Sequence, residues 1–194
     1  LFSLVEPLSC AIHAVNSANL RSEEEVLILG AGSIGTVLTL ALFNKFRGAI
    51  FLLDRIQPKC EKIAACFGSR VGIEKNYGTQ REVVFDSTGT PAGLALACEA
   101  VRKGGKLITM SHLDGEWGTD ILHRKLARKD VSVYLPYLNG DAQTMHEAIM
   151  ILGTHLPSGF SDLLQIEDSS KIQTVFMQKE TTTTNKLVLS IVNE

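Results

Sequence analysis

Short apolar runs alternate with longer segments of helical period along most of the chain. The short runs predict strands that are buried on both faces of a sheet. They lie at Glu25–Leu29, Ala49–Asp54, Val71–Ile73, Arg81–Asp86, Lys106–Met110 and Val131–Tyr134. The segments that predict helices are Leu4–Asn19, Ser33–Phe46, Pro58–Phe67, Pro91–Lys103, Thr119–Arg128 and Asp141–Leu152. This alternation predicts right-handed crossovers and an α/β fold with a doubly wound parallel sheet.

The chain after Pro157 has a different pattern. Ser170–Gln178 predicts a helix, and Lys186–Val192 alternates as a half-buried strand does. A parallel sheet of consecutive crossovers has no place for that last strand. Because the chain begins with Leu1 rather than Met, we expect it to be part of a longer protein, and the last strand to pair with a segment before Leu1.

Composition and charge exclude several classes of function. Residues 26–44 carry no charge, which suggests a membrane span, but Gly30, Gly32 and Gly35 divide the run into a strand and a helix. A formal net charge of −2 gives no basic excess for nucleic acid. The four cysteines fit neither a zinc-knuckle spacing nor a disulfide framework. We therefore expect buried thiols, a reducing and cytoplasmic location, and no nucleic-acid or membrane partner.

The glycines between the first predicted strand and the second helix form the pattern G-x-G-x-x-G. Gly30 permits a tight turn, Gly32 allows the backbone to approach a diphosphate, and Gly35 allows the helix to pack closely on the strand. The amino end of that helix offers amide groups and a positive dipole end to phosphates. The sequence thus predicts a Rossmann-type dinucleotide site, with these cofactor-binding residues in the turn: Gly30, Gly32, Ser33, Ile34 and Gly35.

An acid follows the next apolar strand, as this fingerprint requires. Asp54 can accept hydrogen bonds from both hydroxyls of an adenosine ribose, and its charge disfavours a 2′-phosphate, which favours NAD over NADP. Arg55 could instead pair with that phosphate. An S-adenosylmethionine-dependent methyltransferase also uses a glycine loop and an acid after the second strand, so it remains an alternative, as does a non-catalytic NAD-responsive module.

Several motifs together resemble the medium-chain dehydrogenase/reductase superfamily, nearest to the zinc-type sorbitol and threonine dehydrogenase branch. They are EPLSCAIHAV from Glu6 to Val15, VLILGAGSIG from Val26 to Gly35, Asp54, VVFDSTG from Val83 to Gly89, and GGKLITM from Gly104 to Met110. The resemblance implies the cofactor-binding half of an alcohol or polyol dehydrogenase. It further implies a linking helix at 1–20 from an N-terminal catalytic domain, a Rossmann domain at 21–157, and a C-terminal helix and strand at 158–194 that return to the N-terminal domain.

The resemblance also implies the remaining site residues. Glu6 matches a glutamate near the catalytic zinc of polyol dehydrogenases, although a carboxylate at a helix amino terminus is equally expected there. The other cofactor-binding candidates lie at strand ends or near the last strand, and they are Ser87, Thr88, Ser111, His112, Leu135 and Lys186. His112 is the one candidate for a proton acceptor.

We therefore expect a domain that binds NAD and orients it for hydride transfer to or from a secondary alcohol or polyol. Zinc is expected in the full-length enzyme, with most of its ligands outside this chain. The resemblance implies a homodimer or tetramer, and Val131–Leu138 is the segment expected to form the exposed sheet edge.

Overall fold

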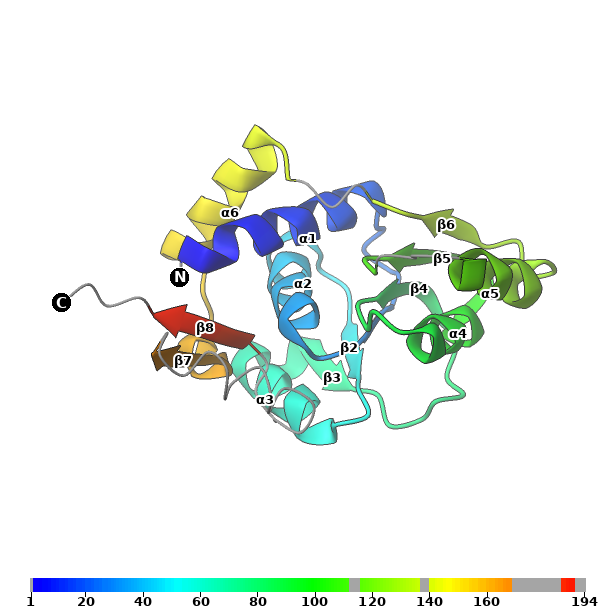
Figure 1. The fold of residues 1–194 in the computed structure, drawn as a ribbon, viewed down its shortest axis with the longest axis horizontal. Coiled ribbons are helices and arrows are strands. Elements are labelled where there is room, and N and C mark those ends of the chain that lie inside the picture. The colour runs from blue at the N-terminus through cyan, green and yellow to red at the C-terminus, as the bar shows by residue number, and fades with distance from the viewer. Residues whose placement is uncertain (1, 112–115, 137–139, 169–185, 191–194) are drawn as a thin grey trace.

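The computed structural model describes residues 2–111, 116–136, 140–168 and 186–190 (Figure 1). Among these residues, six parallel strands form one sheet in the order β3-β2-β1-β4-β5-β6. The strands are β1 (Val26–Leu29), β2 (Ile50–Leu53), β3 (Val71–Ile73), β4 (Arg81–Asp86), β5 (Val101–Thr109) and β6 (Ser132–Tyr134). The strand order reverses between β1 and β4, as in a doubly wound fold, and confirms the predicted fold class.

Helices cover both faces of the sheet. They are α1 (Val5–Ser17), α2 (Ser33–Lys45), α3 (Gln57–Phe67), α4 (Pro91–Ala100), α5 (Glu116–Leu126) and α6 (Ala142–Thr154), with short 3-10 turns at Phe2–Leu4, Gly68–Arg70 and Phe160–Leu163. In Figure 1, α1 runs between α2 and α6, and α4 and α5 lie together at the other end of the molecule. The six helices predicted before Pro157 are confirmed.

The sheet separates two hydrophobic cores. Val26 and Ile28 of β1 face the larger core, which α1, α2, α3 and α6 complete. Leu27 and Leu29 face the smaller core under α4 and α5. All four residues of β1 are buried, because alternate side chains of a central strand enter opposite cores. The charge-free run that begins at Val26 is therefore core structure, and no helix in the described residues is long and apolar enough to cross a bilayer.

The boundary between α4 and β5 differs from the prediction. The helix was expected to reach Lys103, but the backbone turns extended at Val101, where β5 begins. Arg102 and Lys103 at the end of an apolar helix pattern are typical of a helix carboxyl terminus, which explains the error. The buried Val101 side chain belongs to the smaller core instead. In the sheet, the residue opposite Val101 is Arg81 of β4.

The tail forms a separate two-stranded sheet. Strands β7 (Leu164–Asp168) and β8 (Lys186–Ser190) pair in parallel, Leu164 opposite Lys186. The last strand was correctly predicted, and its partner β7 was not. The expected pairing of the last strand with a segment before Leu1 stays a prediction. The helix expected at 170–178 lies outside the described residues.

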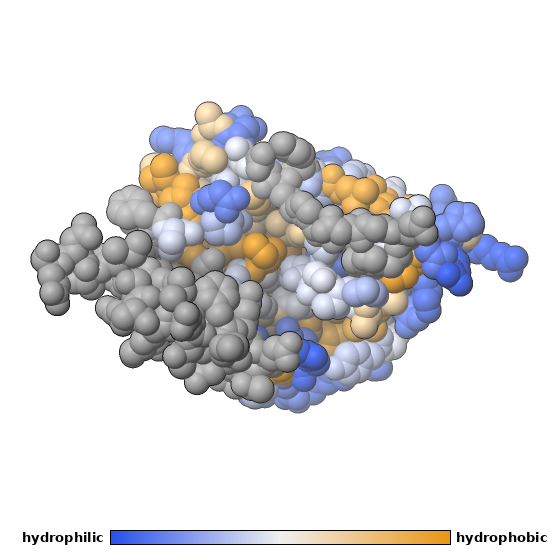
Figure 2. Space-filling view, in the orientation of Figure 1, coloured by the Kyte–Doolittle hydropathy of each residue, from blue (hydrophilic) through white to orange (hydrophobic). Residues whose placement is uncertain are grey.

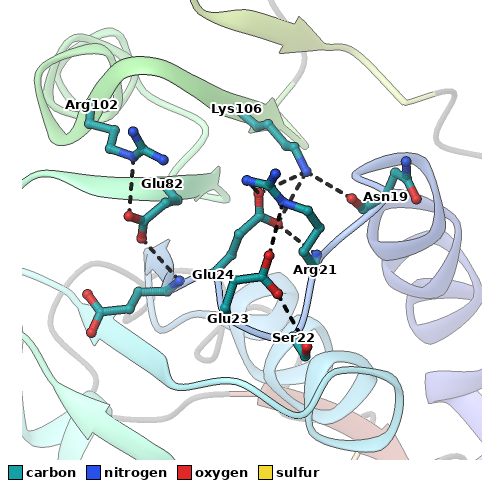
Figure 3. Close-up of polar contacts among 9 residues, drawn as sticks. Asn19, Arg21, Ser22, Glu23, Glu24, Glu82, Arg102 and Lys106 are labelled. Carbon is teal, nitrogen blue, oxygen red and sulfur yellow. Dashed lines mark hydrogen bonds and ion pairs between the residues drawn. The ribbon is translucent and has the colours of Figure 1, made fainter.

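A network of charges joins the loop before β1 to Lys106 within β5 (Figure 3). The Glu24 carboxylate, only 3% exposed, lies 3.1 Å from the Lys106 ammonium, and the Arg21 backbone N–H donates to it at 2.8 Å. Lys106 also donates to the Asn19 carbonyl at 2.8 Å. Burial by itself would raise the pKa of Glu24, but the Arg21 hydrogen bond and the Lys106 charge lower it below its ordinary value of 4.5. The network therefore ties the loop after α1 to the sheet.

Because the lowered pKa belongs to the folded state, Glu24 stabilises the fold above its ordinary pKa and loses this effect as the pH falls through the lowered value. We expect Glu24→Gln to reduce the free energy of unfolding by about 2 kcal/mol at pH 7. In urea unfolding experiments, the loss shrinks as the pH falls below the ordinary pKa of Glu24. Glu23→Gln is the matched control, since Glu23 is 69% exposed and 3.6 Å from Arg21. An equal loss in both variants, or a constant loss across this pH range, contradicts the expectation.

The surface differs in character between the two ends of the molecule. The end that carries α5 is hydrophilic (Figure 2). Hydrophobic residues reach the surface near α6, where Met145, Ile149 and Met150 are between 38% and 49% exposed. Neither region lies at the carboxyl ends of the strands, where the sequence places the candidate site.

Candidate functional site

The turn between β1 and α2 has the close backbone approach that its glycines predict. Gly30 has a φ of +97°, in the region that favours glycine, and its N–H donates to the Leu53 carbonyl at 2.9 Å. A Cβ on Gly35 would lie 1.8 Å from the Gly30 carbonyl oxygen. Both glycines are therefore required by the backbone itself, which brings α2 directly against the end of β1.

The amino end of α2 is open. Gly32 is the N-cap residue, and a Cβ placed on it would meet no atom within 4 Å. Glycine has no side chain to cap the first turn, and the acidic residues that often fill this position are absent from the first turn of α2. The positive end of the helix dipole thus faces a space that an anion can enter.

Asp54 borders this space from the end of β2. One carboxylate oxygen accepts from the Ala31 N–H at 2.7 Å, and the other accepts from the Ile56 N–H at 2.8 Å. A carboxylate has about four acceptor positions, so both oxygens keep capacity for further donors such as ribose hydroxyls. The side chain of the neighbouring Arg55 is exposed. The two backbone hydrogen bonds fix Asp54 against the glycine turn.

Ser87, which follows β4, contacts the same turn from the other side. Its hydroxyl lies 2.8 Å from the Leu29 carbonyl and 3.1 Å from the Gly30 carbonyl. Thr88 and Ser111 lie beyond it, at the ends of β4 and β5, and both hydrogen-bond to the buried carboxylate of Asp86. The structure thus brings together the predicted residues of the glycine turn, Asp54, Ser87, Thr88 and Ser111 at one edge of the sheet.

Of the three other candidates, the structure describes the side chain of Leu135 alone. Leu135 follows the edge strand β6 and is 61% exposed. His112 lies outside the described residues. Lys186 begins β8, and its side chain also lies outside the described part of the chain. Asp86 was not among the predicted site residues, although the motif that contains it was identified.

Glu6 does not belong to a complete metal site in the described part of the chain. Its carboxylate accepts a hydrogen bond from the Cys10 thiol at 3.3 Å, one turn further along α1. No group of three or more histidine, cysteine or acidic side chains is placed to hold a metal among the described residues. Since a catalytic zinc site has three protein ligands, the described residues do not form one by themselves.

The four cysteines are thiols, and three of them are buried, as expected. Burial raises the pKa of Cys60 to about 12, and the negative charge of Asp54 adds to the effect. Burial also raises the pKa of Cys98 to about 11. Thiols of this kind stay protonated at neutral pH and are poor nucleophiles and poor metal ligands. The chemistry of this edge therefore rests on backbone amides, hydroxyls and the carboxylate of Asp54.

The comparison with known proteins agrees with this arrangement. Sorbitol dehydrogenase of Macaca fascicularis is 28% identical over 151 residues, which cover 71% of this chain. Sorbitol dehydrogenase of Arabidopsis thaliana is 33% identical over 127 residues, or 57% of this chain. These similarities support the resemblance to the medium-chain dehydrogenase/reductase family. No family model matches it.

Solved structures of dehydrogenases share the fold. Galactitol-1-phosphate dehydrogenase from Escherichia coli superposes with a TM-score of 0.77 at 19% identity, covering 96% of this chain and 59% of that one. The aligned regions make up 42% and 35% of the two sorbitol dehydrogenases. The chain thus spans about half the length of the proteins that it matches.

Proposed function

We propose that this chain is the coenzyme-binding half of an NAD-dependent dehydrogenase that transfers hydride between a nicotinamide and a secondary alcohol or polyol. The observation that carries the proposal is the open amino end of α2 beside Asp54. The two features follow the neighbouring strands β1 and β2. The hydrogen bond of 2.7 Å from the Ala31 N–H to the Asp54 carboxylate joins them. A diphosphate at the helix and a ribose at the carboxylate is the arrangement that a dinucleotide needs. The sorbitol and xylulose substrates implied by the names of the relatives support a polyol.

The chain's own residues then bind and orient the coenzyme. The first amides of α2 receive the diphosphate, Gly32 leaves room for it, and Asp54 accepts from the adenosine ribose. NAD supplies the hydride chemistry when it is bound. The adenosine half lies on the β2 side of α2, beside Asp54. The nicotinamide half therefore has to lie on the other side, where hydroxyl groups line the ends of β4 and β5.

We further propose that Glu6 faces the substrate and zinc region of the full-length enzyme, and that His112, Leu135 and Lys186 contact the coenzyme there. The exposed edge of β6 fits pairing with a second copy in a homodimer or tetramer, since Val133 is 38% exposed at that edge. Four thiols without a disulfide fit a reducing compartment such as the cytoplasm.

A titration of the chain with NADH, followed by energy transfer from Trp117 or by calorimetry, tests the proposal. We expect saturable binding of one NADH per chain, weaker binding of NADPH and none of S-adenosylmethionine. Sorbitol with NAD gives no steady turnover, because the described residues lack a metal site. Binding of S-adenosylmethionine in preference to NADH favours a methyltransferase and contradicts the proposal. Steady turnover of sorbitol by this chain alone contradicts the proposal that turnover needs the rest of the enzyme.

A further inference from the structure

Asp86 is a carboxylate with no exposed surface at the carboxyl end of β4. One of its oxygens accepts from the Thr88 N–H at 3.0 Å and from the Thr88 hydroxyl at 2.7 Å. The other accepts from the hydroxyls of Thr109 at 3.4 Å and Ser111 at 3.3 Å. All four of these donors are neutral. A buried carboxylate that receives neutral donors alone from the described residues is costly to the fold, which points to a role beyond packing.

The carboxylate sets the direction of the hydrogen bonds around it. An ionised carboxylate only accepts, so the Ser111 hydroxyl has to donate to Asp86 and present its lone pair elsewhere. That oxygen accepts from the Gly89 N–H at 2.9 Å. Asp86 therefore links the turn after β4 to the end of β5 through Ser111. Gly89 has a φ of +66°, a left-handed conformation that this hydrogen bond holds.

The first turn of α4 packs against the turn at Thr88 and Gly89. A Cβ on Gly93 would lie 1.8 Å from the Thr88 hydroxyl oxygen, so the Thr88 side chain packs directly on the first turn of α4. Thr90 caps this helix by accepting from the Gly93 N–H at 3.0 Å. The turn is thus fixed by α4 on one side and by Asp86 on the other.

The position of this turn relates it to one half of the coenzyme. Asp54 lies at the end of β2, on one side of β1, and Asp86 lies at the end of β4, on the other side. A dinucleotide with its adenosine ribose at Asp54 and its diphosphate at α2 crosses β1. Its nicotinamide half then lies over the ends of β4 and β5, beside Thr88, Gly89 and Ser111.

We propose that Asp86 is a positioning residue for the nicotinamide half of the coenzyme. It acts through Ser111 and the Thr88–Gly89 turn rather than by touching the coenzyme. The proposal rests on the proposed function, because it assumes a dinucleotide at this edge. It assigns to Asp86 an effect on nicotinamide binding that is separate from adenosine binding.

Binding of NADH and of ADP to the 194-residue chain separates the two halves, because ADP carries the adenosine and diphosphate alone. We expect Asp86→Asn, which keeps the shape but adds a donor, to raise the Kd for NADH about tenfold. The Kd for ADP should stay within about twofold. Ser111→Ala should shift the Kd for NADH in the same direction and also leave ADP binding unchanged. Asp120→Asn, an exposed carboxylate on α5, is the control and should change neither value.

Each outcome is decisive. A parallel rise in the Kd for both ligands shows a merely structural role and overturns the inference, as does unchanged NADH binding in both variants. If Asp86→Asn does not fold, Ser111→Ala alone decides, since it removes the link to Gly89 and leaves the carboxylate with Thr88 and Thr109. Wild-type chain that binds neither ligand overturns the proposed function and this inference together. Wild-type chain that binds both ligands sustains the proposed function whatever the variants do.

Discussion

Gly35→Ala is expected to destabilise the chain by more than about 3 kcal/mol and to abolish NADH binding. The new Cβ would lie 1.8 Å from the Gly30 carbonyl oxygen, which is a backbone atom and cannot rotate away. Helix α2 would have to move off the end of β1, and the turn that faces the diphosphate would move with it. Urea unfolding measures the first effect, and an NADH titration under native conditions measures the second.

Gly32→Ala is the matched control for this substitution. Gly32 has a φ of −82°, which alanine adopts without strain, and no protein atom lies within 4 Å of the added Cβ. We expect this variant to unfold at the same urea concentration as the wild type, but to bind NADH weakly because the methyl group enters the space of the diphosphate. Wild-type stability in Gly35→Ala would contradict the close approach of α2 to β1. Full NADH affinity in Gly32→Ala would contradict the placement of the diphosphate.

Asp54→Ala is expected to lower the affinity for NADH about 100-fold, because it removes two charge-assisted hydrogen bonds to the adenosine ribose. It also leaves the N–H groups of Ala31 and Ile56 without their acceptor, so part of the loss comes from the glycine turn. The preference for NADH over NADPH should fall at the same time, since the negative charge that repels a 2′-phosphate is gone. Calorimetric titrations with the two coenzymes measure both effects.

Two companion variants separate the causes. Asp54→Asn keeps one acceptor oxygen for the backbone but has no charge. It should lose the preference for NADH over NADPH, with a smaller loss of NADH affinity than Asp54→Ala. Arg55→Ala removes an exposed guanidinium next to the site. If Arg55 pairs with a 2′-phosphate, only the affinity for NADPH falls in this variant. Unchanged Kd values for both coenzymes in Asp54→Ala would exclude Asp54 from the site.

Much of this fold was predictable because its signals are local. The run of apolar residues at β1 and the glycines after it determine a strand, a tight turn and a helix within a few residues of one another. Asp54 was predictable for the same reason, as the acid that ends the next apolar strand. These features depend on backbone sterics and on burial of a central strand, which a sequence expresses directly.

The features that the sequence did not predict depend on distant neighbours. Asp86 looks like an ordinary charged end of a strand, and its burial beside residues such as Thr109 and Ser111 depends on β5 lying alongside. The pairing of β7 with β8 joins segments that are 22 residues apart in register, such as Leu164 and Lys186, without a local turn signal. The end of α4 was misplaced because Arg102 and Lys103 are as typical of a helix terminus as of an exposed strand start.

A crystal structure of the chain grown with saturating NADH would show where the coenzyme binds. We expect the diphosphate at the amino end of α2 over Gly32, with the ribose hydroxyls of the adenosine within hydrogen-bond distance of the Asp54 carboxylate. NADH bound at another surface, or no coenzyme at this edge of the sheet, would contradict it.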